Sequence, residues 1–337
     1  MSKFTPKPLA DQVIVITGAS SGIGLATAYR AASRGARVVL VARNKAALDA
    51  AVGAIGADGG QALAVVADVA DRNQVQDVAD AAIRAFGGFD TWVNNAGIGM
   101  FGTLDEVTDG DHRRIFDVNY FGVVNGSLVA TKHFRRHGGT IVNLGSVASD
   151  ISIPLQSPYA ATKAAIRAFT DGLRMELLHE GVPVRISLIR PAAIDTPFAE
   201  HARNYMAREP RLPPPLFPPE KVADAILHAA EHGDRDYYVG TGSLVSTLVN
   251  KVAPHIVDKA VARFVPAASK RFSAPQRPGA GNLFAPGRGG DVHGDNSTMK
   301  LHRRSARPPA PSRAPFAAAA AVALVGTVLG LLGGRKA

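Results

Sequence analysis

Short apolar runs and stretches with helical spacing alternate along residues 11–240. The apolar runs predict strands at 13–17, 37–41, 62–67, 91–94, 140–144, 185–189 and 237–239. Ala-rich stretches between them have the three- and four-residue apolar spacing of helices, as at 24–32, 75–86 and 159–178. Near-continuous apolar strands that alternate with helices are typical of a parallel sheet covered on both faces. The pattern therefore predicts an α/β fold, a doubly wound parallel sheet whose ligand lies at the carboxyl ends of the strands.

The pattern changes after Gly240, so we expect one catalytic domain at 1–242 with a C-terminal extension. Residues 243–265 are amphipathic, and Pro254 is expected to break or kink a helix there. Such a helix could cover the domain, contact a subunit or lie in a membrane interface. Residues 266–315 are rich in Pro, Gly and Arg and poor in large apolar residues, which predicts a disordered basic linker.

Residues 316–334 are a run of 19 residues without charge. At about 1.5 Å per residue, a helix of this length spans about 28 Å, close to one hydrocarbon core. Arg313 precedes the run, and Arg335 and Lys336 follow it. The run predicts a transmembrane anchor, and a disordered or partner-binding tail is the alternative for so Ala- and Gly-rich a segment.

Composition and charge narrow the function classes. The 337 residues contain no cysteine, which excludes disulfides, cysteine-ligated zinc and thiolate catalysis. The net charge is +10, but residues 266–337 hold eleven Lys and Arg and two Asp, so +9 belongs to the tail. A basic tail suits anionic lipid or is a solvated linker, and without interleaved aromatic residues it predicts no nucleic-acid binding. Residues 1–12 lack the apolar run of a secretory signal, so we expect a cytoplasmic catalytic domain.

A glycine-rich loop joins the first predicted strand to the first helix. The sequence Thr-Gly-Ala-Ser-Ser-Gly-Ile-Gly covers residues 17–24. Glycines permit a tight turn and close approach to a pyrophosphate, and the helix N-terminus supplies N–H donors. Because it lies between a strand and a helix, the motif predicts a dinucleotide site formed by Gly18, Ser20, Ser21, Gly22, Ile23 and Gly24.

Residues at the ends of the next strands predict which coenzyme binds. No Asp or Glu ends the second strand, and Arg43 follows at once, which favours NADP over NAD because guanidinium suits a 2′-phosphate. An ordinary surface charge is the alternative for Arg43. Further residues at strand ends are expected beside the adenosine and ribose, namely Asp68, Val69, Asn95, Ala96 and Gly97.

Three side chains predict proton chemistry at a carbonyl or alcohol oxygen. Ser146 follows the fifth strand, Tyr159 opens a long helix, and Lys163 lies four residues further on the same helix face. A free tyrosine has a pKa of about 10, and a nearby ammonium favours the phenolate. The pair could then exchange a proton with a substrate oxygen that Ser146 also contacts.

Together these motifs resemble the classical short-chain dehydrogenase/reductase family over about residues 11–240. The resemblance implies a Rossmann fold and a homodimer or homotetramer. It implies that Tyr159 is the general acid/base, that Lys163 holds the nicotinamide ribose, and that Asn119 supports a proton relay. It also implies that Asp68 and Val69 meet the adenine and that Asn95 fixes the central strands. The loop from Pro191 to Thr196 would touch the nicotinamide, although Ala192 stands where the family often has Gly.

The expected substrate is a small hydrophobic ketone, aldehyde or alcohol. Apolar residues flank the motifs, namely Met100, Phe101, Ile151, Ile153, Pro154, Leu155, Phe198, Tyr205, Met206, Leu216 and Phe217. No metal is expected, since three histidines between 201 and 232 lack acids at ligand spacing. An epimerase or dehydratase, and a membrane-tethered coenzyme-binding sensor or scaffold, are the alternatives.

Overall fold

A seven-stranded parallel sheet forms the centre of the molecule. The computed structural model describes residues 4–212, 215–240, 249–250, 252–271 and 279–295. Its sheet has the order β3-β2-β1-β4-β6-β7-β9, and every pair is parallel. The strands are β1 (Val13–Thr17), β2 (Arg37–Ala42), β3 (Ala62–Val66), β4 (Thr91–Asn94), β6 (Gly139–Leu144), β7 (Val184–Pro191) and β9 (Asp236–Val239). Each of the seven predicted strands is therefore present, and the doubly wound fold is confirmed.

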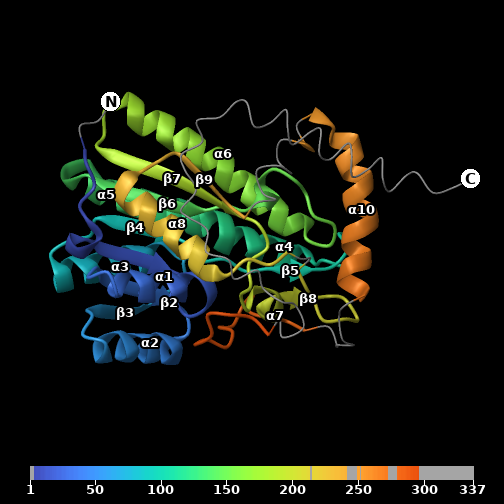
Figure 1. The fold of residues 1–337 in the computed structure, drawn as a ribbon, viewed down its shortest axis with the longest axis horizontal. Helices are drawn as coiled ribbons and strands as arrows, with labels where there is room; N and C mark the ends of the chain where they lie inside the picture. Colours follow the sequence, from blue (N-terminus) through green and yellow to red (C-terminus); the bar gives the residue numbers. More distant parts are fainter. Residues whose placement is uncertain (1–3, 213–214, 241–248, 251, 272–278, 296–337) are drawn as a thin grey trace, which may run out of the picture.

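Helices cover both faces of this sheet (Figure 1). Ile14 and Ile16 of β1 pack in one hydrophobic cluster with α1, α2 and α8, whereas Val13 and Val15 pack in a second cluster with α3, α4, α5 and α6. Both faces of β1 are thus buried, which explains its unbroken apolar sequence. The helices are α1 (Gly22–Ala32), α2 (Lys45–Ala57), α3 (Arg72–Phe86), α4 (Asp109–Phe116), α5 (Gly122–His137), α6 (Ser157–His179), α7 (Phe198–His201), α8 (Pro219–His232) and α10 (Pro254–Arg271).

The strand order reverses between β1 and β4, and this point positions the site. Strands β2 and β3 lie to one side of β1, and β4, β6, β7 and β9 lie to the other. Connections that leave β1 and β4 in opposite directions open a crevice at the carboxyl ends of these strands. A second, two-stranded sheet pairs β5 (Met100–Phe101) with β8 (Arg203–Asn204) in parallel, and β5 follows the carboxyl end of β4 along the chain.

The C-terminal extension differs in part from its prediction. The helix breaks before Pro254, as expected, and α10 then continues to Arg271, beyond the predicted boundary at 265. Helix α10 stands at the edge of the molecule, apart from the sheet (Figure 1). Residues 279–295, predicted as part of a disordered linker, instead hydrogen-bond to the catalytic domain. Most of these hydrogen bonds use the backbone amides and carbonyls of residues 279–295, so few large side chains are needed.

The predicted transmembrane anchor at 316–334 lies outside the described residues and stays a prediction. Within the described part of the chain, no helix has both the length and the apolar character needed to cross a membrane.

Candidate active site

The glycine-rich loop lies directly between β1 and α1. Gly18 has a φ of +68°, and a Cβ at this position would lie 2.7 Å from the Cα of Ala96. Only glycine fits there, because the backbone is left-handed and the space is closed. Helix α1 begins at Gly22, so the N–H groups of its first turn have no partner within the helix; that of Gly22 donates to the main-chain carbonyl of Asp291 at 2.9 Å.

Asn95 ties this loop to the end of β4. Its Nδ2 donates to the carbonyls of Thr17 at 2.8 Å and Gly18 at 3.2 Å. The main-chain N–H groups of Asn95 and Ala96 donate in turn to the Thr17 hydroxyl at 3.0 and 3.1 Å. The loop is thereby fixed to the central strands, the role that the resemblance implies for Asn95.

Arg43 and Asp68 lie at the adenosine end of the crevice, each with a partner that the sequence did not indicate. The Arg43 guanidinium donates to the main-chain carbonyls of Asn282 and Leu283 at 2.5 and 3.2 Å. Burial lowers the pKa of Arg43, and the carboxylate of Asp68 acts in the opposite direction. Asp68 is paired with Arg114, whose Nε donates to the Leu283 carbonyl at 3.0 Å.

Ser146, Tyr159 and Lys163 come together where β6 ends and α6 begins. Ser146 follows β6 and caps a short 3-10 helix, where its hydroxyl accepts from the main-chain N–H of Ala148 at 3.1 Å. Lys163 is 5% exposed, and its Nζ donates to the Leu144 carbonyl at 2.7 Å. The same Nζ lies 5.6 Å from the centre of the Tyr159 ring. The serine, tyrosine and lysine predicted from spacing are therefore close in space.

Burial dominates the ionisation of this group. It raises the pKa of Tyr159 to about 12, although a hydrogen bond with Ser146 acts in the opposite direction. It lowers the pKa of Lys163 to about 8. The expectation that Lys163 lowers the tyrosine pKa is therefore not met, because burial outweighs the other effects on the phenol. Desolvation disfavours the charged form of both side chains.

Asn119 lies in a π-helical turn, Asp117–Phe121, that joins α4 to α5. Its side chain is fully buried. The Oδ1 accepts from the N–H of Ile98 at 2.8 Å, and the Nδ2 donates to the Ile98 carbonyl at 3.0 Å and the Thr162 hydroxyl at 3.2 Å. Asn119 thus connects the loop after β4 with α6, although it does not line the cavity.

One cavity of about 370 Å³ joins these groups. All the predicted coenzyme residues except Gly24 line it, and Gly24 packs against Gly18 instead. Pro191 ends β7, and Thr196 packs on Gly22. Among the described residues, Leu155 is the only non-glycine with a positive φ, so Ala192 has a conformation open to alanine.

The end of the cavity near Tyr159 is apolar. The ring of Phe198 lies 5.2 Å from that of Tyr159, centre to centre. Of the apolar residues singled out in the sequence, Phe101, Ile153, Pro154 and Phe198 line the cavity. Met100 is instead fully buried in the core, and the Tyr205 hydroxyl donates to Asp111 at 2.6 Å.

Sequence reasoning missed several residues that line the cavity, namely Gln156, Arg211, Leu212, Asn282, Pro286, Gly287 and Arg288. The last four belong to residues 279–295, about 240 residues from Arg43 along the chain. No local pattern connects such distant segments, and a Pro- and Gly-rich composition indicated the opposite, a linker.

Comparison with known proteins identifies the family. The family model described as short chain dehydrogenase matches residues 12–207. The oxidoreductase YxnA of Bacillus subtilis is 41% identical over 261 residues, which are 77% of this chain and 73% of YxnA. The 11-beta-hydroxysteroid dehydrogenase A of Sesamum indicum is 35% identical over 239 residues, which are 67% of this chain and 68% of that protein.

Solved structures agree with this result. A short chain dehydrogenase/reductase from Burkholderia phymatum in complex with NAD is 30% identical, with a TM-score of 0.66, over 75% of this chain and 96% of that one. An alcohol dehydrogenase from Thermococcus sibiricus complexed with 5-hydroxy-NADP is 28% identical, with a TM-score of 0.60, over 68% and 94%. The chain belongs to the short-chain dehydrogenase/reductase family and is an NAD(P)-dependent oxidoreductase.

The residues present fit such a coenzyme. The glycine-rich loop lines the cavity, and the start of α1, at Gly22 and Ile23, lies at the same wall, where a helix N-terminus favours phosphate. Lys163 lines the same cavity, and an ammonium there would hold the hydroxyls of a ribose.

Proposed function

We propose that this enzyme interconverts a small hydrophobic ketone or aldehyde and its alcohol with NADP(H), and that Tyr159 is the general acid/base. The observation that carries the proposal is the Ser146–Tyr159–Lys163 group at the apolar end of a dinucleotide cavity. In that position the two hydroxyls can hold one substrate oxygen while a proton moves.

Each of the chain's residues has a distinct task in reduction. The bound nicotinamide supplies the hydride. Ser146 donates a hydrogen bond to the substrate oxygen as negative charge develops there, and Tyr159 gives its proton to the same oxygen. A phenol with a pKa near 12 keeps its proton at neutral pH, which suits the acid role. Lys163, with a pKa of about 8, carries a proton at neutral pH that can restore the phenol.

The apolar wall supports a hydrophobic substrate. Phe101, Ile153 and Phe198 line the same cavity as Tyr159, with Phe198 against its ring, and burying apolar groups against them favours binding. The relative from Sesamum indicum is named for a steroid, a substrate of the same chemical class.

The charge at the adenosine end supports NADP. Arg43 uses two of its five N–H donors on main-chain carbonyls, which leaves others for a 2′-phosphate. The carboxylate of Asp68, which would repel a phosphate, is neutralised by Arg114.

Turnover of a panel of apolar ketones and aldehydes by the full chain tests the proposal. NADPH and NADH are compared, and Tyr159→Phe is expected to lose roughly 10²–10⁴-fold in kcat while still binding coenzyme. Tyr29→Phe, on α1 and outside the cavity, is the matched control. Turnover retained in Tyr159→Phe would exclude the acid/base role. Coenzyme binding by the wild type without turnover of any substrate would favour the sensor or scaffold.

A further inference from the structure

Residues 279–295, which we name the strap, cross the adenosine end of the coenzyme cavity. Figure 1 shows the strap running from α7 toward α2, below β2 and α1. The N–H of Gly290 donates to the Ser20 carbonyl at 2.9 Å, and the N–H of Gly22 donates to the Asp291 carbonyl at 2.9 Å. The strap is therefore attached to the glycine-rich loop itself.

A second attachment joins the strap to the end of β2. The Arg43 guanidinium binds two strap carbonyls, and the Asn44 side chain donates to the Gly287 carbonyl at 2.9 Å. The side chain of Leu283 is fully buried in the same cluster as Val69. Complete burial of a leucine side chain favours this attachment by about 1.5–3 kcal/mol, which supports a fixed wall of the cavity.

The strap also presents polar groups at the cavity. Asn282 lines the cavity, and its Oδ1 is buried with no hydrogen-bond partner in the described structure. Arg288 lines the cavity as well, is exposed, and forms no ion pair with any described residue. Burial lowers the pKa of His201, which lines the same cavity, and the positive charge of Arg288 acts in the same direction. The neighbours of Arg288 in the chain, Gly287 and Gly290, bind Asn44 and the Ser20 carbonyl, so Arg288 belongs to the cavity wall beside the glycine-rich loop, where a guanidinium has the chemistry to bind a phosphate.

We propose that the strap forms the adenosine wall of the coenzyme site and that Arg288 binds a phosphate of the coenzyme. The proposal rests on the proposed function, since it requires that the cavity binds NADP or NAD. The phosphate is either the 2′-phosphate, which NADPH alone carries, or the pyrophosphate, which both coenzymes carry.

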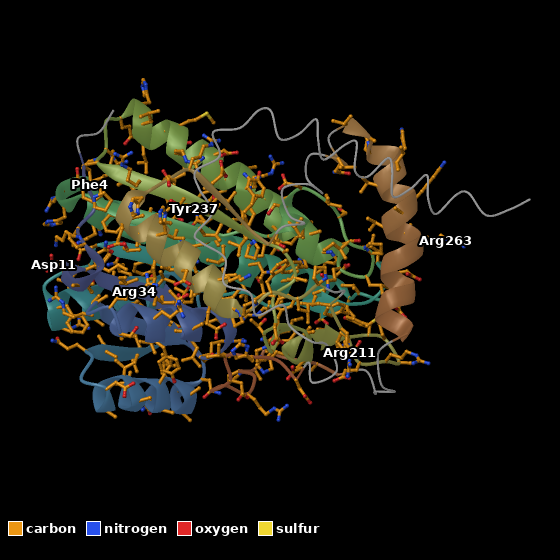
Figure 2. All side chains as sticks on the ribbon, in the orientation of Figure 1. Phe4, Asp11, Arg34, Arg211, Tyr237 and Arg263 are labelled. Atoms are coloured by element: carbon orange, nitrogen blue, oxygen red, sulfur yellow. The ribbon has the colours of Figure 1, made fainter. Side chains whose placement is uncertain are left out.

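The test measures dissociation constants for NADPH and NADH by fluorescence titration of the full chain. Arg288→Gln is compared with Arg263→Gln, a matched control because Arg263 points away from the molecule on α10 (Figure 2). Arg288→Gln is expected to weaken binding roughly tenfold, the effect of losing one charge-assisted hydrogen bond. A loss for NADPH alone assigns the 2′-phosphate, and an equal loss for both coenzymes assigns the pyrophosphate.

A second variant tests the wall independently of charge. A Cβ at Gly289 would lie 2.9 Å from the Ser20 carbonyl oxygen and closer still to Ala47, so Gly289→Val should lift the strap off the loop. We expect weaker binding of both coenzymes. Unchanged binding in both Arg288→Gln and Gly289→Val, or tighter binding in Gly289→Val, would overturn the proposal. If the wild-type chain binds neither coenzyme, the proposed function fails instead.

Discussion

Replacing Lys163 with methionine should stabilise the coenzyme-free protein while it abolishes turnover. The ammonium is 5% exposed, and burial lowers its pKa from 10.5 to about 8. At about 1.4 kcal/mol per pKa unit, holding this charge at pH 7 costs the folded state on the order of 3 kcal/mol. Methionine removes that cost, but it leaves the Leu144 carbonyl without its donor, which costs about 1–3 kcal/mol. The expected net gain in the free energy of unfolding is therefore up to about 2 kcal/mol.

The pH dependence of the stability difference between Lys163→Met and the wild type distinguishes the cost of a buried charge from a simple change in packing. The unfolded chain keeps the lysine proton up to about pH 10.5, whereas the folded protein releases it near pH 8. The cost of the charge is therefore complete below pH 8 and disappears as the pH rises to 10.5. The advantage of Lys163→Met should shrink across this range and reverse near its upper end, where only the lost hydrogen bond remains.

Urea unfolding at pH 7, 9 and 10.5 measures both effects, with Lys132→Met at an exposed position of α5 as the control. The control should stay within about 0.5 kcal/mol of the wild type at each pH. A Lys163→Met protein that is less stable than the wild type at pH 7, by an amount that does not vary with pH, would refute the reasoning.

Two further predictions concern Arg43 and the C-terminus. Arg43→Asp should weaken NADPH binding more than NADH binding, because it places a carboxylate near the 2′-phosphate. Release of the strap, which Arg43 holds, would weaken the binding of both coenzymes equally. The ratio of the two dissociation constants therefore measures the effect on the phosphate. An unchanged ratio would remove Arg43 from the phosphate site. Ending the chain after residue 315 should release it from membranes if 316–334 is an anchor, as measured by flotation with lipid vesicles, and a full chain that does not float would exclude the anchor.

The sheet was predictable because its signals are local. Strands β1 and β2 are buried on both faces, except at the two ends of β2, and therefore have continuous apolar runs in the sequence. The turns at Gly18 and the spacing of Tyr159 and Lys163 are also local, since one loop and one helical turn fix them. These features locate the coenzyme loop and the acid/base group without knowledge of the tertiary structure.

The ionisation of Tyr159 could not be predicted in the same way. Spacing indicated a neighbouring ammonium and hence a lowered pKa, but the pKa is raised, because desolvation depends on all the atoms that surround the phenol. Those atoms come from the packing of β6, α6 and the loop after β4. A short stretch of sequence cannot predict this packing.

The strap shows the same limit over a longer distance. By itself the sequence determined the α/β fold, the glycine-rich loop and the candidate acid/base residues, because each depends on periodicity or on contacts within a few residues. Only the tertiary structure decided that Arg43 contacts Asn282 and Leu283 and that Arg288 lines the coenzyme cavity. Backbone amides and carbonyls form most of the strap's contacts, and every sequence has these groups, so its composition could not reveal where it binds.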